Sequence, residues 1–522
     1  MEKPIINIVW LKRDLRTRDH APLAAAVAAG LPFVMLYCFE PSIMASPKQS
    51  PRHWRFVAQS LEDLRGRGWP VVSWWGEVTE ALEAINLNNK INTIYCHQET
   101  GHKLTFDRDK IVFNYCRDRS IDVIESVQDA AIRGRKHRNG FGEHVDDFLA
   151  RPPVPGVDDK SQVFGNETLM LPTAVVSDGF TTDFTQAQTE IAVSPTKPGY
   201  YEPIYVTDTN FQPGGETNAW RYLRSFTAER GKWYAYKLGS PTLSRTSCSR
   251  MSTYLAYGCV SVRQVFQWAK RVATEHPAWA YDLKMFRERL WWRAHYFQKL
   301  EAEWQIEGRP INLAFLELHR TSDHALLDAF KNARTGFPII DANIRCLKAT
   351  GWINFRSRAM LVTFATFVCW LDWRPIATFL GSLFLDYEPG IHYGQFQMQA
   401  GLTGYHPPRN YNPYTQGDKY DADGAFVHQW IPELRTIPAP FCHYPYRMTA
   451  MEQSMYGLND LNYPAPVVDY SANSKVNMDR YWEIRHSEAA QGNLVGIWLK
   501  HVLPESRAEY MRGVDPSPRR DV

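Results

Sequence analysis

The chain has 522 residues, of which 44% are hydrophobic and 22% are charged. One hydrophobic core rarely organises so long a chain, so we expect at least two domains. The net charge of +3 does not require a nucleic-acid partner, so any basic surface must be local. No apolar run reaches about 18 residues, which argues against a membrane-spanning helix. No signal peptide is recognisable, and we expect a cytoplasmic protein.

The eight cysteines are scattered along the chain and include no CxxC pair. This spacing favours buried thiols in a reducing compartment over a disulfide framework. It gives no support for an iron–sulfur cluster, and we expect no metal site.

Residues 1–145 alternate short apolar runs with helical patterns, which is typical of a parallel α/β sheet. The chain contains no GxGxxG sequence, so this doubly wound sheet lacks the dinucleotide-binding fingerprint. The predicted strands are 5–11, 32–39, 70–75, 91–96 and 121–125, and the predicted helices among them include 21–29 and 54–66.

The composition changes at about residue 146. Residues 146–215 contain a proline-rich run at 152–156 and a Thr/Asp-rich stretch at 178–189, so we interpret them as an interdomain linker that crosses the surface. Residues 216–505 show helical patterns separated by Pro and Gly, which predicts an all-α C-terminal domain. Residues 506–522 are expected to be a disordered tail.

A cluster of hydroxyl side chains, Ser247, Ser249 and Ser252, precedes a predicted helix at 253–257. Hydroxyls at this position commonly cap a helix. The start of a helix also favours a bound diphosphate, because free N–H groups and the helix dipole attract anions there. The residues alone leave both interpretations open.

Other candidate residues also have ordinary explanations. Phe286, Leu290 and Arg293 share one helix face, which is typical of core packing. His392 is either a buried core histidine or a proton donor. Arg356 and Arg409 are either solvated surface arginines or phosphate ligands.

The segments 409–421 (RNYNPYTQGDKYD) and 430–435 (WIPELR) resemble the signature of the photolyase/cryptochrome family. Members of this family bind FAD and use blue light to repair DNA or to signal. The resemblance covers about residues 5–450. Further matching blocks are 9–16, 97–101, 248–261, 286–293, 334–341, 351–359 and 386–398.

The resemblance implies that FAD is the cofactor and that 248–261 holds its pyrophosphate. Tyr234 would also contact a phosphate, with Tyr236 as a competing candidate. Asp386 would pair with Arg358 beside the flavin ring, and Glu388 would face the polar edge of that ring. The full set of implied FAD-binding residues is Tyr234, Cys248, Ser249, Arg250, Met251, Ser252, Phe286, Arg289, Arg293, Phe355, Arg358, Asp386, Glu388 and His392.

Several of these positions depart from the family pattern. Cys248 replaces a threonine, and Arg289 replaces the glutamate that binds the pyrimidine dimer. Phe355 replaces a polar residue near the flavin and the lesion. His392 occupies the position facing flavin N5, where an imidazole could donate to a flavin anion or pass a proton to it.

The electron route implied by the resemblance is also altered. Phe396 replaces the first tryptophan of the usual chain, Trp373 matches the second, and Arg320 lies near the third. Trp352 or Trp370 could support another path. The residues assigned to the light chemistry are Trp373, Trp352 and His392.

The resemblance further implies a monomer that binds UV-damaged DNA through Trp292, Arg356 and Arg409. The expected activity is a FAD-dependent photolyase that splits pyrimidine dimers, cyclobutane dimers in particular, with electrons from excited reduced flavin. The alternative is a cryptochrome-type photoreceptor that binds FAD without repair. The N-terminal domain would be of the antenna type, and residues 97–101 lie near the pocket for a second chromophore of open identity.

Overall fold

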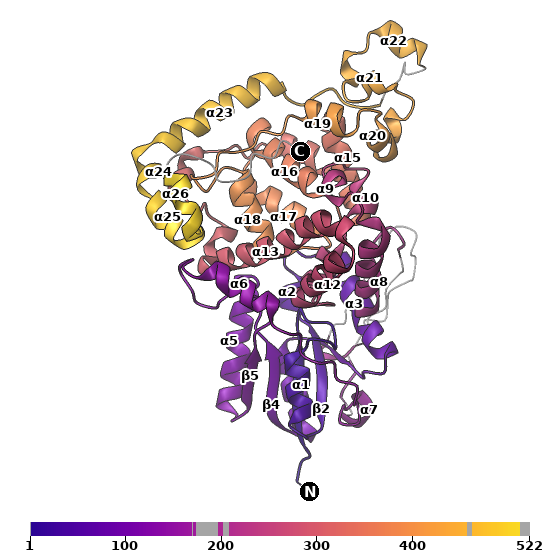
Figure 1. Cartoon of the computed structure of the whole chain (residues 1–522), viewed down its shortest axis with the longest axis vertical. Helices are drawn as coiled ribbons and strands as arrows, with labels where there is room; N and C mark the ends of the chain where they lie inside the picture. The colour runs from indigo at the N-terminus through magenta and orange to yellow at the C-terminus, as the bar shows by residue number, and fades with distance from the viewer. Residues whose placement is uncertain (1, 170, 174–196, 202–207, 457–461, 512–522) are drawn as a thin grey trace.

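The computed structural model describes residues 2–169, 171–173, 197–201, 208–456 and 462–511. Its N-terminal part is a six-stranded sheet with the order β5-β4-β1-β2-β3-β6 (Figure 1). Five strands are parallel, which confirms the predicted doubly wound sheet, and β6 is antiparallel to β3. The strands are β1 Ile5–Leu11, β2 Phe33–Phe39, β3 Val72–Trp75, β4 Lys90–His97, β5 Asp122–Ser126 and β6 Gly199–Tyr200.

The central strands are buried on both faces, as expected for near-continuous apolar runs. Successive side chains of a strand point to opposite faces. Accordingly, Val9 and Leu11 of β1 belong to one hydrophobic core, and Ile8 and Trp10 belong to another. The helices of this part are α1 Ala21–Ala28, α2 Pro41–Met44, α3 Pro51–Gly66, α4 Val78–Asn88, α5 Lys103–Asp118 and α6 Phe141–Ala150.

The expected linker at 146–215 is partly built into this domain. It contains α7 (Asn166–Leu169) and β6, and β6 pairs with β3 through Trp74 and Trp75. Leu169 and Leu171 are buried in the core beneath the sheet. A surface-crossing linker is therefore wrong for these segments, because they cover apolar surface. The stretch 178–189 lies outside the described residues.

The second part of the chain is a helical domain, as predicted, and Figure 1 shows it stacked against one end of the sheet. Its α-helices are α8 Glu216–Ser225, α9 Tyr234–Lys237, α10 Ser244–Ser247, α11 Met251–Ala256, α12 Val262–Glu275, α13 Ala280–Ala302, α14 His324–Lys331, α15 Pro338–Thr350, α16 Phe355–Thr363, α17 Trp373–Leu383, α18 Pro389–Gln399, α19 Pro413–Tyr420, α20 Ala425–Trp430, α21 Ala439–Cys442, α22 Ala450–Met455, α23 Tyr470–His486, α24 Glu488–Gly492, α25 Leu494–His501 and α26 Pro504–Met511. Two π-helical turns, Phe226–Arg230 and Phe364–Val368, extend α8 and α16.

Helix α26 corrects the prediction that the tail is disordered from residue 506. Pro504 begins this helix, and the ring of Tyr510 packs 5.2 Å from the ring of Tyr405. This aromatic contact holds α26 against the rest of the helical domain.

Arginine side chains of the N-terminal domain bind backbone carbonyls of the helical domain. Arg13 donates to Tyr387 O at 3.2 Å, and Arg16 donates to Gly258 O at 3.0 Å. Arg52 donates to Leu383 O at 2.9 Å. One hydrophobic core also contains residues of both parts. No helix within the described residues combines the length and apolar character needed to cross a membrane.

Candidate functional site

A cavity of about 290 Å³ lies in the helical domain among α9, α11, α13, α16 and α18. Every residue implied as FAD-binding lines it: Tyr234, Cys248, Ser249, Arg250, Met251, Ser252, Phe286, Arg289, Arg293, Phe355, Arg358, Asp386, Glu388 and His392. Trp352 lines it too. Of the two candidate tyrosines, Tyr234 lines the cavity, whereas Tyr236 is 77% exposed on the surface.

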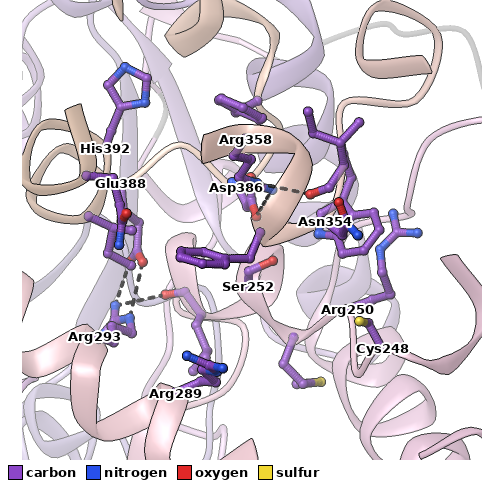
Figure 2. A pocket seen from close by; sticks show the side chains of 18 of the residues that line it. Cys248, Arg250, Ser252, Arg289, Arg293, Asn354, Arg358, Asp386, Glu388 and His392 are labelled. Atoms are coloured by element: carbon purple, nitrogen blue, oxygen red, sulfur yellow. Dashed lines mark hydrogen bonds and ion pairs between the residues drawn. The ribbon is translucent and has the colours of Figure 1, made fainter. Parts of the chain in front are cut away.

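One end of the cavity is formed by the turn into α11 (Figure 2). The helix begins at Met251, two residues earlier than predicted, and Arg250 precedes it with a left-handed φ of 61°. The side chain of Ser249 accepts a hydrogen bond from the Met251 N–H at 3.3 Å. The guanidinium of Arg250 lies 4.2 Å above the Trp352 ring.

Arg250 supplies a positive charge that the described residues do not neutralise. Its Nε is buried and has no hydrogen-bond partner within the described part of the chain. Burial lowers the pKa of Arg250 to about 10, so the side chain remains protonated at neutral pH. An anionic group in the cavity would satisfy this guanidinium.

The centre of the cavity contains an ion pair between Arg358 and Asp386, as predicted. Arg358 Nη2 donates to both carboxylate oxygens of Asp386, at 3.0 and 2.8 Å. Its Nε donates to Ile353 O at 3.0 Å, which fixes the guanidinium against the start of α16. Asn354 caps that helix through a hydrogen bond from Ser357 N–H at 3.0 Å.

A second ion pair forms another wall. Arg293 of α13 donates to Glu388 at 2.5 and 3.2 Å and also contacts Asp129 of the N-terminal domain. Burial raises the pKa of Glu388, and the charge of Arg293 opposes that rise. The pair is fully inside the protein, so each charge depends on the other for compensation.

His392 lies on the same side of the cavity as Glu388 (Figure 2). Its Nε2 is 2.8 Å from Ala377 O, and because a carbonyl only accepts, Nε2 carries the proton. Burial lowers the pKa of His392 to about 3, so the ring is neutral at pH 7. The remaining nitrogen, Nδ1, can only accept. In this arrangement the proton of His392 is held by Ala377 O and not directed to the cavity, and the role of His392 toward the flavin stays a prediction.

The mouth of the cavity presents aromatic and basic side chains. Arg289 is exposed, with its guanidinium carbon 5.9 Å from the ring of Phe355. Phe355 and Trp292 are each 42% exposed. Burial raises the pKa of Tyr296, and the charges of Arg289 and Arg409 oppose that rise.

The residues implied as DNA ligands lie around the cavity instead of lining it. Trp292 is one helical turn beyond Arg289, and its ring is 6.4 Å from that of Tyr296. Arg356 packs its guanidinium 4.4 Å from the Tyr420 ring and donates to Gln416 at 3.3 Å. Arg409 is exposed.

The three residues that the resemblance assigns to the electron route lie in the core of the helical domain or beside it. Trp373 does not line the cavity but lies 6.3 Å, ring to ring, from Phe396, which does. Arg320 lies between Phe367 and Trp370, with its guanidinium carbon 5.1 and 5.2 Å from their rings. The three positions therefore hold a phenylalanine, a tryptophan and an arginine.

A second, smaller cavity lies at the carboxyl ends of the N-terminal strands, lined by residues that include Glu40, Glu99, Gly101, His102 and Arg108. Part of the 97–101 block predicted near an antenna pocket thus lines a cavity.

Asp14, His20 and His97 are the His/Cys/Asp/Glu group that, within the described residues, is compact enough to suggest a metal. His20 Nδ1 accepts from Leu23 N–H at 3.1 Å, so its Nε2 carries the proton and faces Asp14 at 3.1 Å. His97 Nδ1 is 2.7 Å from the same carboxylate oxygen. Both histidines therefore contact one oxygen of the buried Asp14 carboxylate.

Some lining residues were not predicted, including Asn354, Tyr387 and Gln395. Asn354 carried a usable signal, since Asn directly before a helix is a common N-cap. Tyr387 lies in the chain between Asp386 and Glu388, both of which were predicted. Nothing in the local sequence of Gln395 indicates that it faces a cavity.

The residues that line the cavity are suited to bind FAD. Arg250 and the α11 turn suit a diphosphate, the walls are mostly apolar side chains that suit a planar ring system, and Asp386 and Glu388 offer acceptors for polar N–H and O–H groups. A parallel α/β domain joined to a helical domain with such a cavity defines the class of a two-domain flavin-dinucleotide protein.

Two family models match the chain: "DNA photolyase" over residues 7–145 and "FAD binding domain of DNA photolyase" over residues 286–483. The chain is 27% identical to the cryptochrome DASH of Natronomonas pharaonis over 484 residues, covering 89% of this chain and 98% of that protein. It is 27% identical to the deoxyribodipyrimidine photo-lyase of Escherichia coli over 481 residues, covering 89% and 96%.

Solved structures share the fold. A Synechocystis cryptochrome aligns with a TM-score of 0.73 at 21% identity, covering 92% of this chain and 99% of that one. A class III photolyase from Agrobacterium tumefaciens aligns with a TM-score of 0.72 at 22% identity, covering 93% and 98%. The chain belongs to the photolyase/cryptochrome family and contains the FAD-binding domain of that family.

Proposed function

We propose that the chain is a monomeric, cytoplasmic, FAD-dependent DNA photolyase that uses blue light to split cyclobutane pyrimidine dimers. The observation that carries this proposal is the mouth of the cavity. Two exposed aromatic rings, Trp292 and Phe355, lie there beside the exposed arginine Arg289. Aromatic faces stack on unpaired bases, and arginines bind phosphate, so this mouth suits an extruded nucleotide pair.

Each side chain at the mouth has a role in this proposal. Arg356 and Arg409 hold phosphates on either side of the lesion. Trp292 packs against the extruded bases, and Arg289 donates hydrogen bonds to their carbonyl oxygens. Within the cavity, the Arg358–Asp386 pair orients the cofactor. FAD held by these residues would supply, once reduced and excited, the electron needed to open the dimer.

The proposed cofactor-binding unit is residues 216–505, with 1–145 as an antenna-type domain. The second cavity, beside Glu99 and Gly101, is the place where a second chromophore would bind. Its identity is left open.

The decisive experiment is repair in vitro. Chemically reduced, FAD-loaded protein is illuminated with oligonucleotides that contain one cyclobutane dimer or one six-four photoproduct, and restored bases are quantified by chromatography. We expect light-dependent restoration of the cyclobutane dimer. Absence of repair of both lesions by protein with bound reduced FAD would contradict the photolyase proposal.

A cryptochrome-type photoreceptor is the second candidate. The observation that favours it is Arg289, because a guanidinium cannot accept the N3–H of a thymine in the dimer. The named relatives include both a cryptochrome DASH and a deoxyribodipyrimidine photo-lyase. A photoreceptor would bind FAD and respond to light while leaving both lesions unrepaired, so the same assay separates the two functions.

A further inference from the structure

A cluster of buried nitrogen donors lies where α13 packs against α25. Its members are Arg138, which precedes α6, and His295 and Lys299 of α13. The side chain of Arg138 is completely buried, and His295 and Lys299 are only 6% and 5% exposed. None of the three lines either of the two cavities described above, so the cluster is separate from the cofactor site.

Arg138 is fixed in place by two backbone carbonyls. Its Nε donates to Lys500 O at 3.2 Å, and its Nη2 donates to His295 O at 3.1 Å. A helical carbonyl points toward the N–H group four residues later, so the guanidinium lies within one helical turn of Lys299. The third nitrogen, Nη1, is buried and has no hydrogen-bond partner among the described residues.

Lys299 adds a second cation to the cluster. Because His295 and Lys299 are four residues apart, their side chains share one face of α13. Lys299 Nζ donates to Tyr405 Oη at 2.7 Å. The phenol oxygen accepts this bond, so its own O–H is available to donate. His295 Nδ1 is also buried, and it has no hydrogen-bond partner in the described part of the chain.

The cluster contains donors but no acid. Within the residues that the structure describes, no carboxylate bonds to the side chain of Arg138 or Lys299. Glu303 follows α13, but its Oε2 already accepts from Lys500 and His501, each at 3.0 Å.

The two cations respond differently to this environment. Burial and the charge of Arg138 lower the pKa of Lys299 to about 7, so Lys299 can lose its proton. Burial lowers the pKa of Arg138 only to about 9, so the guanidinium stays charged at neutral pH. A buried charge without a counter-charge is strongly unfavourable, and an anion beside Arg138 would remove that cost.

We propose that this cluster binds one small inorganic anion through four donors: Arg138 Nη1, Lys299 Nζ, His295 Nδ1 and Tyr405 Oη. His295 takes the tautomer with its proton on Nδ1. The ring of His295 is 5.2 Å from the ring of Trp292, so the anion stabilises the part of α13 that reaches the mouth of the FAD cavity. This inference does not depend on the proposed function, because it requires neither light nor DNA.

The experiment measures the thermal midpoint, Tm, of the full-length protein while sodium chloride replaces sodium gluconate at constant ionic strength. Gluconate is too large for a buried site of this kind. We expect Tm to rise by about 1–2 °C for each tenfold increase in chloride above the dissociation constant. Bromide should act like chloride, and anomalous scattering from crystals grown in bromide should place an ion next to Arg138 Nη1.

Variants of Lys299 locate the effect. We expect Lys299→Met to lose at least half of the chloride-dependent rise in Tm, and Lys299→Arg to retain it. Lys12→Met is the matched control, because Lys12 is also buried but pairs with Asp109 at 3.0 Å. The control should keep the full chloride dependence.

A Tm that is equal in chloride and gluconate would overturn the inference. Equal chloride dependence in the parent protein and Lys299→Met would also overturn it, because the anion would then bind elsewhere. The bromide crystals need no variant, so they test the site whether or not Lys299→Met folds. Absence of bromide beside Arg138 in those crystals would refute the assignment.

Discussion

Arg293 donates two hydrogen bonds to Glu388, from Nη2 at 2.5 Å and from Nε at 3.2 Å, inside the protein. The guanidinium also contacts Asp129. One side chain thereby joins α13, the segment before α18 and the N-terminal domain, and forms a wall of the cavity.

Replacing Arg293 by methionine should destabilise the protein strongly. Two carboxylates would lose their cation in a buried site, and breaking such a pair costs about 3–5 kcal/mol. Urea unfolding followed by circular dichroism measures the loss. Adding Glu388→Gln should restore part of the stability, because the second variant removes a stranded charge. Equal stability of the parent protein and Arg293→Met would contradict a stabilising role for the buried ion pairs of Arg293.

Loss of the Arg358–Asp386 pair should release FAD. Arg358→Met leaves Asp386 without its partner at the centre of the cavity, so we expect FAD affinity to fall by about tenfold or more. Equilibrium dialysis of apoprotein with FAD measures the dissociation constant. Arg345→Met is the matched control, because Arg345 makes a similar two-bond pair with Glu433 but does not line the cavity.

Low pH should lower the free energy of unfolding, and His53 should contribute to this loss. Its Nδ1 accepts from Ser50 N–H and its Nε2 donates to Phe384 O, at 3.0 and 2.9 Å, so only the neutral ring fits. Burial lowers the pKa of His53 from 6.5 to about 3. Between these pH values the unfolded chain binds a proton that the folded chain does not, so the free energy of unfolding falls as pH falls.

The measurement is the free energy of unfolding from pH 7 to pH 4. His53→Gln keeps a donor for Phe384 O but does not titrate, so its pH dependence should be shallower by about one proton. His319→Gln serves as the control, since the His319 side chain is 79% exposed. Identical slopes for the parent and His53→Gln would rule out this role.

Arg409→Gln should weaken binding to dimer-containing DNA and lower the salt slope of that binding by about one, as expected for one lost phosphate contact. Fluorescence anisotropy at several salt concentrations measures both quantities. Lys110→Gln, an exposed change on α5 of the N-terminal domain, should alter neither. A slope that stays constant in Arg409→Gln would place Arg409 away from the DNA.

The sequence predicted the sheet well, because β1 and β2 are continuous apolar runs whose burial leaves few alternatives. It also predicted the lining of the cavity, since the 248–261 and 386–398 blocks carry a specific order of residues. It missed β6, because a strand of two residues has no periodicity of its own. Such a strand forms only when β3 is already present to pair with it.

The donor properties of His392 were beyond prediction for a related reason. Its tautomer is set by Ala377 O, which lies fifteen positions earlier in the chain on another helix. The stacking of Tyr387 on His102 likewise joins residues of the two domains. Such contacts form when elements that are distant in the sequence pack together. Local sequence patterns therefore do not predict them.

Arg13 binds the carbonyl of Tyr387, which itself lines the cavity, and Arg16 and Arg52 bind carbonyls in segments next to lining residues. A helical domain produced alone would keep all of its lining side chains but lose these three anchors. The N-terminal domain therefore helps to hold the cofactor site in its shape. Any light-harvesting role of this domain is additional to that structural role.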